Sequence, residues 1–196
     1  DVARYGQFAA DDRYLRATTA QFYARRFVIA YPNEELPAGR PLKKTPSYEA
    51  QKALGARFGV VWGMESPQYF ATGEPDFVEP PTLRRTAADR FVAAEVAATR
   101  SAAGLLDTGV YARYEVRGPG ALKFLNYVCS NEMDQPIGAI TYTQCLNKRG
   151  GIECDFTVTR LAEDRFFIVT GTAFGQHDMS WLSLNMPEDG TVTIED

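Results

Sequence analysis

The second half of the chain alternates hydrophobic and polar residues between short turn signals, a pattern typical of strands. Segments 139–146, 151–160 and 165–170 are predicted as three consecutive strands, because side chains at every second strand position share one face. Two further strands are predicted at 111–116 and 191–195, and the pattern identifies no partner for the last. Consecutive strands joined by tight turns pair antiparallel, so we expect an antiparallel sheet.

Helical patterns flank these strands. Residues 86–103 are rich in alanine, begin with a capping motif at Thr86 and stop before Gly104. An amphipathic helix follows the turn at 117–120, and another is predicted at 175–184. The sequence therefore predicts an α+β fold, an antiparallel sheet with flanking helices.

The chain before residue 81 has a different sequence pattern. A helix-like stretch at 11–31 leads into a segment with four prolines, 32–46, which is predicted to be extended. A short helix is predicted at 48–54 with Ser47 as its N-cap. A second proline-rich tract at 66–82 is predicted to be a linker. Because prolines interrupt the apolar runs, we expect an irregular and helical segment at 1–80 and the main folded domain at 81–196.

Composition narrows the function classes. The 196 residues are 45% hydrophobic and 23% charged, which is ordinary for a globular protein. The net charge of −4 provides no basic surface for nucleic acid or for an acidic membrane. No apolar run reaches the ~18 residues of a membrane span. We therefore expect neither a nucleic acid nor a membrane as partner.

Three cysteines and one histidine limit the metal and disulfide chemistry. Cys129, Cys145 and Cys154 form no C-x-x-C pair and are too scattered for a disulfide framework, which indicates a reducing compartment. A single histidine, His177, is more often structural than catalytic. We therefore expect no metal site and no triad of serine, histidine and aspartate.

The strand at 151–160 carries the candidate chemistry. Its alternation places Glu153 and Asp155 on the polar face, away from the core residues. A preceding loop of two or four residues centred on 148–149 then puts Tyr142 opposite Asp155 and Gln144 opposite Glu153. Such a cluster could hold a polar heterocycle and accept a proton from it. The alternative is a strand face that is simply solvated, which is common for charged strand residues.

Several motifs occur in a characteristic order. They are GLLDTG at 104–109, VRGPGA at 116–121, YTQ at 142–144 and GGIECDFTVTR at 150–160. In order and spacing they resemble the folate-binding domain of the glycine-cleavage T-protein (aminomethyltransferase) family. The likeness is greatest to the form fused to flavin-dependent dimethylglycine and sarcosine dehydrogenases or oxidases.

The resemblance implies site residues and a cofactor. Asp155 matches the family's essential aspartate, which lies beside the folate ring amines and assists the loss of a proton during one-carbon transfer. Tyr142 matches a tyrosine that lines the folate site, although a strand tyrosine can also be only half-buried packing. Tyr111 matches a pocket position, and Gly171 falls near a backbone position that approaches the pteridine. The implied cofactor is tetrahydrofolate.

Upstream motifs resemble the end of the flavin half of these fused enzymes. They occur at 26–32, 39–41, 45–48, 55–59 and 63–67. The chain contains no G-x-G-x-x-G, so FAD is expected only in a missing upstream domain. We therefore interpret 1–80 as the carboxyl-terminal tail of a flavin-enzyme region with a linker. Residues 81–196 are interpreted as the first part of the folate-binding domain, and the chain as an internal fragment of a longer enzyme.

Two function classes follow from this interpretation. The first is a segment of a demethylating enzyme that passes a one-carbon unit from a methylated glycine or related amine to tetrahydrofolate. The second is a non-catalytic module that binds folate or serves as a scaffold for a flavoprotein. The expected partners are folate, a small methylated amine and the rest of the parent polypeptide. The expected location is the cytoplasm, or the mitochondrial matrix in a eukaryote.

Overall fold

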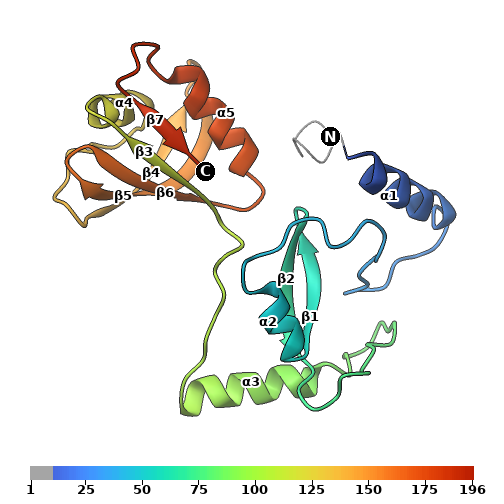
Figure 1. The fold of residues 1–196 in the computed structure, drawn as a ribbon. Helices are drawn as coiled ribbons and strands as arrows, with labels where there is room; N and C mark the ends of the chain where they lie inside the picture. Colours follow the sequence, from blue (N-terminus) through green and yellow to red (C-terminus); the bar gives the residue numbers. More distant parts are fainter. Residues whose placement is uncertain (1–10) are drawn as a thin grey trace. The chain divides into compact units, whose positions relative to one another are not determined.

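The computed structural model describes residues 11–196, which form two compact units that divide between Val110 and Tyr111 (Figure 1). The sequence-based boundary after residue 80 falls inside the first unit, and residues 1–10 of the first predicted domain lie outside the described part. No helix within residues 11–196 is long and apolar enough to cross a membrane.

The second unit is built on a five-stranded sheet. Its strands lie in the order β4-β5-β6-β3-β7, and each neighbouring pair is antiparallel. Their bounds are Ala112–Arg117 for β3, Ile140–Leu146 for β4, Ile152–Ala162 for β5, Arg165–Thr170 for β6 and Thr193–Glu195 for β7. The final strand, which the sequence left without a partner, pairs with β3 at the edge of the sheet. The predicted α+β fold with an antiparallel sheet is confirmed.

Two helices supply the other half of the core in this unit. Helix α4 spans Ala121–Val128 and α5 spans Gly175–Asn185. Apolar side chains at alternate strand positions pack against them, as expected for a sheet with one covered face. The largest fully buried apolar members of this core are Tyr114, Val116, Leu125, Phe166, Ile168 and Leu182. The face turned away from α4 and α5 carries the intervening residues, and we call it the outer face.

The first unit contains three helices and a hairpin. Helix α1 spans Asp12–Ala24, α2 spans Tyr48–Ala53 and α3 spans Asp89–Ser101. Strands β1 (Ala56–Val61) and β2 (Met64–Phe70) pair antiparallel.

The hairpin corrects the sequence analysis, which predicted neither strand and placed a linker at 66–82. Trp62 and Gly63 both have positive φ, at 51° and 82°, and such a two-residue turn matches the twist of paired strands. The proline at position 67 misled the prediction, because proline is usually rare within strands. It sits in β2, close to a register shift in the opposite strand.

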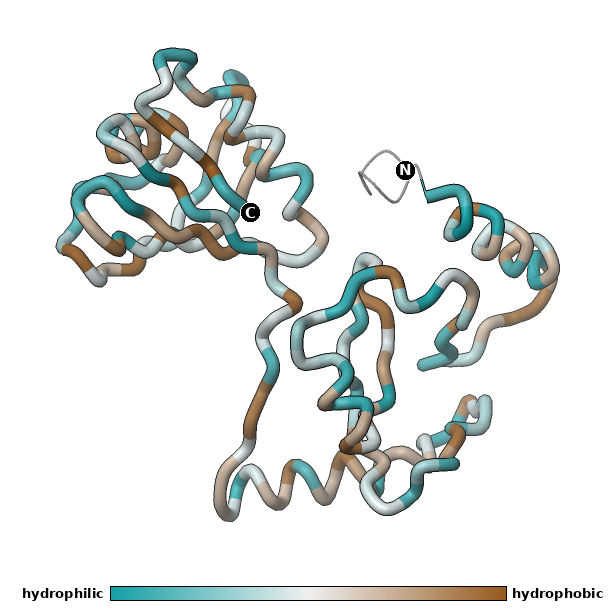
Figure 2. The backbone as a smooth tube through the Cα atoms, in the orientation of Figure 1, coloured by the Kyte–Doolittle hydropathy of each residue, from teal (hydrophilic) through white to brown (hydrophobic). Residues whose placement is uncertain are grey.

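Side-chain contacts hold the first unit together. Tyr69 and Phe91 stack with ring centroids 5.9 Å apart in a small apolar core that Phe77 also joins. Arg40 donates two hydrogen bonds, of 2.9 and 2.6 Å, to the buried carboxylate of Glu65. By contrast, the apolar side chains at 27–31, directly after α1, are exposed, and 90% of the surface of Phe27 is accessible. Figure 2 shows this hydrophobic stretch at the end of the helix.

Candidate functional site

The β4–β5 hairpin carries the principal candidate, Asp155. Asp155 lies on the outer face of β5 and is exposed, as the alternation predicted. Its directly opposite partner on β4 is Gln144, whereas Tyr142 lies opposite Thr157. The predicted pairing of Tyr142 with Asp155 is therefore wrong by two positions.

Two local features cause this shift. The loop between the strands spans five residues, because the side-chain oxygen of Asn147 accepts hydrogen bonds from the backbone N–H groups of Arg149 (2.9 Å) and Gly151 (3.0 Å). Gly150 supports the tight turn with φ of 77°. A β-bulge then follows, because Cys145 pairs with Cys154 while Leu146 pairs with Ile152. The longer loop and the bulge each move the register by one residue.

Asp155 keeps polar contacts with both residues that the sequence singled out on β4. The Gln144 side-chain amide donates to Oδ1 of Asp155 at 3.4 Å. The Tyr142 phenol also hydrogen-bonds the Asp155 carboxylate, and this bond raises the pKa of Tyr142 above its ordinary value. The cluster is therefore an acidic group flanked by an amide and a phenol.

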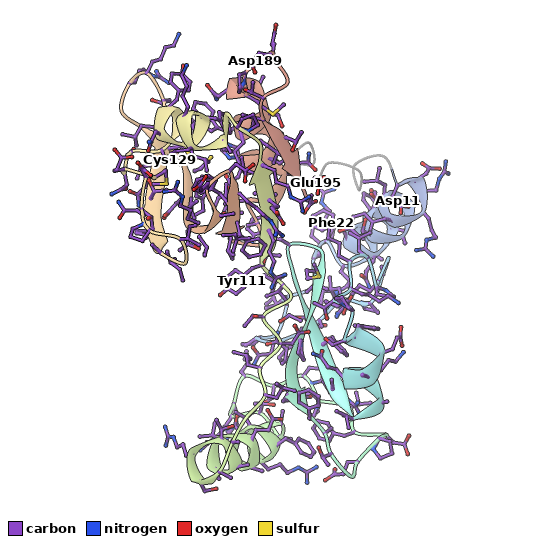
Figure 3. All side chains as sticks on the ribbon, turned by 60° about the vertical axis from the view of Figure 1, so that its left-hand side comes forward. Asp11, Phe22, Tyr111, Cys129, Asp189 and Glu195 are labelled. Carbon is purple, nitrogen blue, oxygen red and sulfur yellow. The ribbon has the colours of Figure 1, made fainter. Side chains whose placement is uncertain are left out.

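The other two predicted site residues lie at the same end of the sheet. Thr170, the last residue of β6, pairs with Phe156 on one side and with Ala112 on the other. Extending both registers by one residue aligns Gly171 with Asp155 and with Tyr111. Tyr111 lies where the chain enters β3 and is labelled in Figure 3. Because neighbouring strands are about 4.8 Å apart, the row from Asp155 to Tyr111 spans roughly 10 Å.

The chemistry of this row suits a flat heterocycle with amine groups. Both tyrosines are substantially exposed, at 60% for Tyr142 and 48% for Tyr111, so their rings are available for stacking. Gly171 leaves the strand end without a side chain, and a Cβ there would meet the Phe174 ring at 3.3 Å. The carboxylate oxygens of Asp155, between the two rings, are hydrogen-bond acceptors that suit ring amines. The row and the neighbouring Tyr142 thus provide one carboxylate, two exposed aromatic rings and one strand-end position without a side chain.

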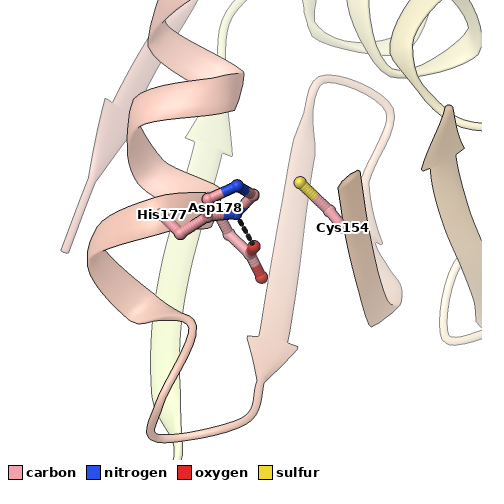
Figure 4. Close-up of side chains that lie close together, drawn as sticks. All are labelled: Cys154, His177 and Asp178. Carbon is pink, nitrogen blue, oxygen red and sulfur yellow. Dashed lines mark hydrogen bonds and ion pairs between the residues drawn. The ribbon is translucent and has the colours of Figure 1, made fainter. Parts of the chain in front are cut away.

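A second polar cluster lies on the core side of the same sheet. Cys154 of β5 meets His177 and Asp178 of the first turn of α5 (Figure 4). The sequence gave His177 a structural role and attached no chemistry to Asp178, since 23 residues separate Cys154 from His177. Only the packing of α5 on the sheet brings these side chains together.

The bulge also redirects Glu153, which the alternation had placed beside Asp155. Glu153 accepts a 2.8 Å hydrogen bond from the side chain of Asn147. Its other carboxylate oxygen lies 3.6 Å from Nε2 of His177. Bulges commonly re-aim a side chain in this way. Glu153 therefore belongs with the second cluster, and Asp155 is the carboxylate that faces Tyr142 and Gln144.

Family comparisons agree with the fold and with the motif order. The model described as "GCVT N-terminal domain" matches residues 47–196, and the model described as "FAD dependent oxidoreductase central domain" matches residues 1–45. The chain therefore belongs to the GCVT N-terminal domain family, as the resemblance of its motifs predicted. Members of this family bind folate.

Individual relatives include an oxidase and a regulatory subunit. The 4-methylaminobutanoate oxidase (formaldehyde-forming) of Paenarthrobacter nicotinovorans is 34% identical over 93% of this chain, which covers 22% of that enzyme. The mitochondrial pyruvate dehydrogenase phosphatase regulatory subunit of Mus musculus is 28% identical over 100% of this chain and 23% of that protein. The chain thus spans less than a quarter of the length of these relatives.

A solved structure supports the fold directly. The glycine cleavage system aminomethyltransferase T from Bartonella henselae superimposes with a TM-score of 0.62 at 30% sequence identity. The match covers 78% of this chain and 37% of that protein.

Proposed function

We propose that this chain carries the folate-facing sheet of an enzyme that passes a one-carbon unit from a methylated amine to tetrahydrofolate. The observation that carries the proposal is the row at one end of the outer face, in which Asp155 lies between Gln144 and Gly171, with Tyr111 beyond. The family match supports the same assignment, and the similar proteins include a 4-methylaminobutanoate oxidase and an aminomethyltransferase.

In this proposal Asp155 is the base. Its carboxylate accepts the proton that an amine nitrogen loses when a new carbon–nitrogen bond forms. Gln144 holds one oxygen of the carboxylate, so the other oxygen can face the reacting amine. Tyr142 and Tyr111 supply stacking surfaces for the ring, and Gly171 allows the ring to approach the backbone.

Asp155→Asn in the full-length polypeptide tests this role. Asparagine keeps the shape and the hydrogen bonds but cannot accept the proton, so folate-dependent product should fall by roughly 10²- to 10⁴-fold. Oxidation of the amine should remain close to the wild-type rate, since a separate flavin site performs it. Product formed per amine oxidised, measured with tetrahydrofolate in excess, reports the difference.

Asp164→Asn is the matched control, because Asp164 is an exposed aspartate in the turn between β5 and β6. It should leave both rates unchanged. A transfer rate that is equally unaffected by Asp155→Asn would remove Asp155 from the mechanism.

A second candidate function is a non-catalytic folate-binding or scaffold module. The match to a regulatory subunit over the whole chain favours it. In that case the wild-type protein should bind tetrahydrofolate without forming any product, and Asp155→Asn should change binding alone. Equilibrium binding measured beside product formation separates the two functions.

The same proposal extends to the first part of the chain, the location of FAD, the amine donor and the cellular compartment. The flavin-enzyme tail expected at 1–80 would then be its first part, because the FAD oxidoreductase model matches 1–45 and the GCVT model begins at residue 47. FAD would then bind elsewhere in the parent polypeptide. A small methylated amine would be the donor. A matrix location in a eukaryotic source is suggested by the mitochondrial relatives.

A further inference from the structure

We propose that Cys154, His177 and Asp178 form a zinc-binding site that ties α5 to β5. Their ligand atoms, a thiol sulfur, an imidazole nitrogen and a carboxylate oxygen, all lie within 4.8 Å of one another. Figure 4 shows the three side chains converging between the helix and the strand. This site lies on the core side of the sheet and does not depend on the proposed transfer function.

The geometry is close to what zinc requires. Zinc bonds of about 2.0–2.3 Å place tetrahedral ligand atoms roughly 3.3–3.7 Å apart. Nδ1 of His177 is already 3.1 Å from Oδ1 of Asp178. A movement of about 1 Å by the Cys154 thiol would therefore bring all three ligand atoms to the separations found around one zinc ion.

The charge of the buried Asp178 side chain is an independent reason to propose a cation at this site. The side chain of Asp178 is 1% exposed, and a buried carboxylate is costly unless a cation compensates it. Within residues 11–196, the ion pairs give Asp178 no lysine or arginine, and His177 is its one basic partner. Zn²⁺ bound by a thiolate, a carboxylate and a neutral imidazole makes a site with no net charge. Such a site suits the apolar core around it.

Neighbouring groups orient two of the ligands. The Thr170 hydroxyl donates a 2.6 Å hydrogen bond to Oδ2 of Asp178, which leaves Oδ1 turned toward the cluster. On the far side of the imidazole, a carboxylate oxygen of Glu153 lies 3.6 Å from Nε2. A carboxylate in this position favours a proton on Nε2 and leaves Nδ1 free to coordinate. Histidine ligands of zinc usually have such an orienting partner.

Zinc binding has a defined proton balance. Zinc takes a cysteine ligand as the thiolate, whereas an ordinary cysteine thiol carries its proton at neutral pH. The new zinc–sulfur bond forms as the sulfur–hydrogen bond breaks, and the proton passes to the buffer. Each zinc ion bound should therefore release about one proton.

Cobalt is a direct probe of the thiolate ligand. The 196-residue chain, stripped with a chelator, should bind one equivalent of Co²⁺ and develop a thiolate-to-cobalt charge-transfer absorption in the near ultraviolet. Zn²⁺ should abolish that absorption by displacement. Calorimetry of Zn²⁺ binding in two buffers with different ionisation enthalpies should return the single proton.

Variants assign the ligands. Cys154→Ser should remove the charge-transfer absorption, and His177→Gln should weaken zinc binding at least 10-fold. Glu153→Gln should weaken it by about 10- to 100-fold, as is typical of an orienting partner. Cys129→Ser is the control, since Cys129 is a buried cysteine outside the cluster, and it should keep the absorption.

Because the His177 side chain is half exposed, His177→Gln should disturb folding less than Cys154→Ser and serves as the test variant if Cys154→Ser fails to fold. In that event, titration with Co²⁺ followed by the charge-transfer absorption should show at least 10-fold weaker binding for His177→Gln than for the wild type. The proposal is overturned if Co²⁺ gives no charge-transfer absorption, if the absorption survives Cys154→Ser, or if His177→Gln binds zinc as the wild type does. Any of these results would leave the 3.1 Å hydrogen bond between His177 and Asp178 as a structural contact without a metal.

Discussion

Gln144 lies directly opposite Asp155 in the β4–β5 pair and donates its side-chain amide to Oδ1 at 3.4 Å. The contact gives the exposed carboxylate a fixed neighbour on the adjacent strand. In the proposed reaction, Gln144 is thus a positioning residue for Asp155.

Gln144→Leu should slow folate-dependent transfer by about 2- to 10-fold, because a net hydrogen bond contributes ~0.5–1.5 kcal/mol. The loss should appear in kcat for transfer, with amine oxidation unchanged. Gln176→Leu, at an exposed position of α5, is the control and should have no effect. A Gln144→Leu enzyme that transfers at the wild-type rate would argue against a positioning role.

Asn147 determines the shape of the loop that sets this register. Asn147→Ala removes two backbone hydrogen bonds and the bond to Glu153, so the free energy of unfolding of the second unit should fall by about 1–2 kcal/mol. Chemical denaturation followed by far-ultraviolet circular dichroism measures the change. Lys148→Ala, at an exposed position of the same loop, should change it by less than about 0.5 kcal/mol. Equal midpoints for the two variants would show that the Asn147 side chain does not stabilise the loop.

Asp107 connects the segment at 45–51 of the first unit with its own segment at 107–109 through hydrogen bonds. It accepts hydrogen bonds from the hydroxyl groups of Ser47 and Thr45, from the Gln51 amide, and from the backbone N–H of Gly109. The Ser47 bond is the largest cause that lowers the pKa of Asp107 to about 2. Asp107→Ala should reduce the free energy of unfolding by about 1.5–3 kcal/mol near neutral pH, the range for hydrogen bonds to a charged group.

The same contribution should depend on pH in a defined direction. Because the folded-state pKa of Asp107 lies below its ordinary value of 3.8, the stabilisation is complete above pH ~4 and declines as the pH falls toward 2. Thermal melts of wild type and Asp107→Ala should therefore converge between pH 4 and pH 2. Asp76→Ala, at an exposed loop position, should parallel the wild type throughout. A gap that stays constant over this range would contradict the assignment.

The boundaries of most elements in the second unit followed from local pattern. Predicted strands at 165–170 and 139–146 correspond to β6 and β4 within one residue, because alternation and turn residues are short-range signals. The hairpin at 56–70 was missed, because its turn depends on a tryptophan with positive φ and one strand contains a proline. Neither feature is a usual strand signal.

In the candidate site, too, some features followed from the sequence and others only from the tertiary structure. The sequence by itself determined that Asp155 lies on the polar face of its strand, and the motif order indicated its chemistry. It could not determine the partner of Asp155, because alternation has a period of two and a two-residue shift leaves every side chain on the same face. The Asn147 loop and the bulge at Glu153 decided that partner to be Gln144.

Contacts between distant segments were decided only in three dimensions. The pairing of β7 with β3 joins residues nearly 80 positions apart, and the meeting of Cys154 with His177 and Asp178 depends on how α5 packs on the sheet. Sequence periodicity reports which face of an element is apolar, but it does not report which element covers that face. The sequence therefore determined the strands and helices of the second unit and the face on which Asp155 lies, while tertiary packing decided the register, the sheet edge and the polar cluster beneath it.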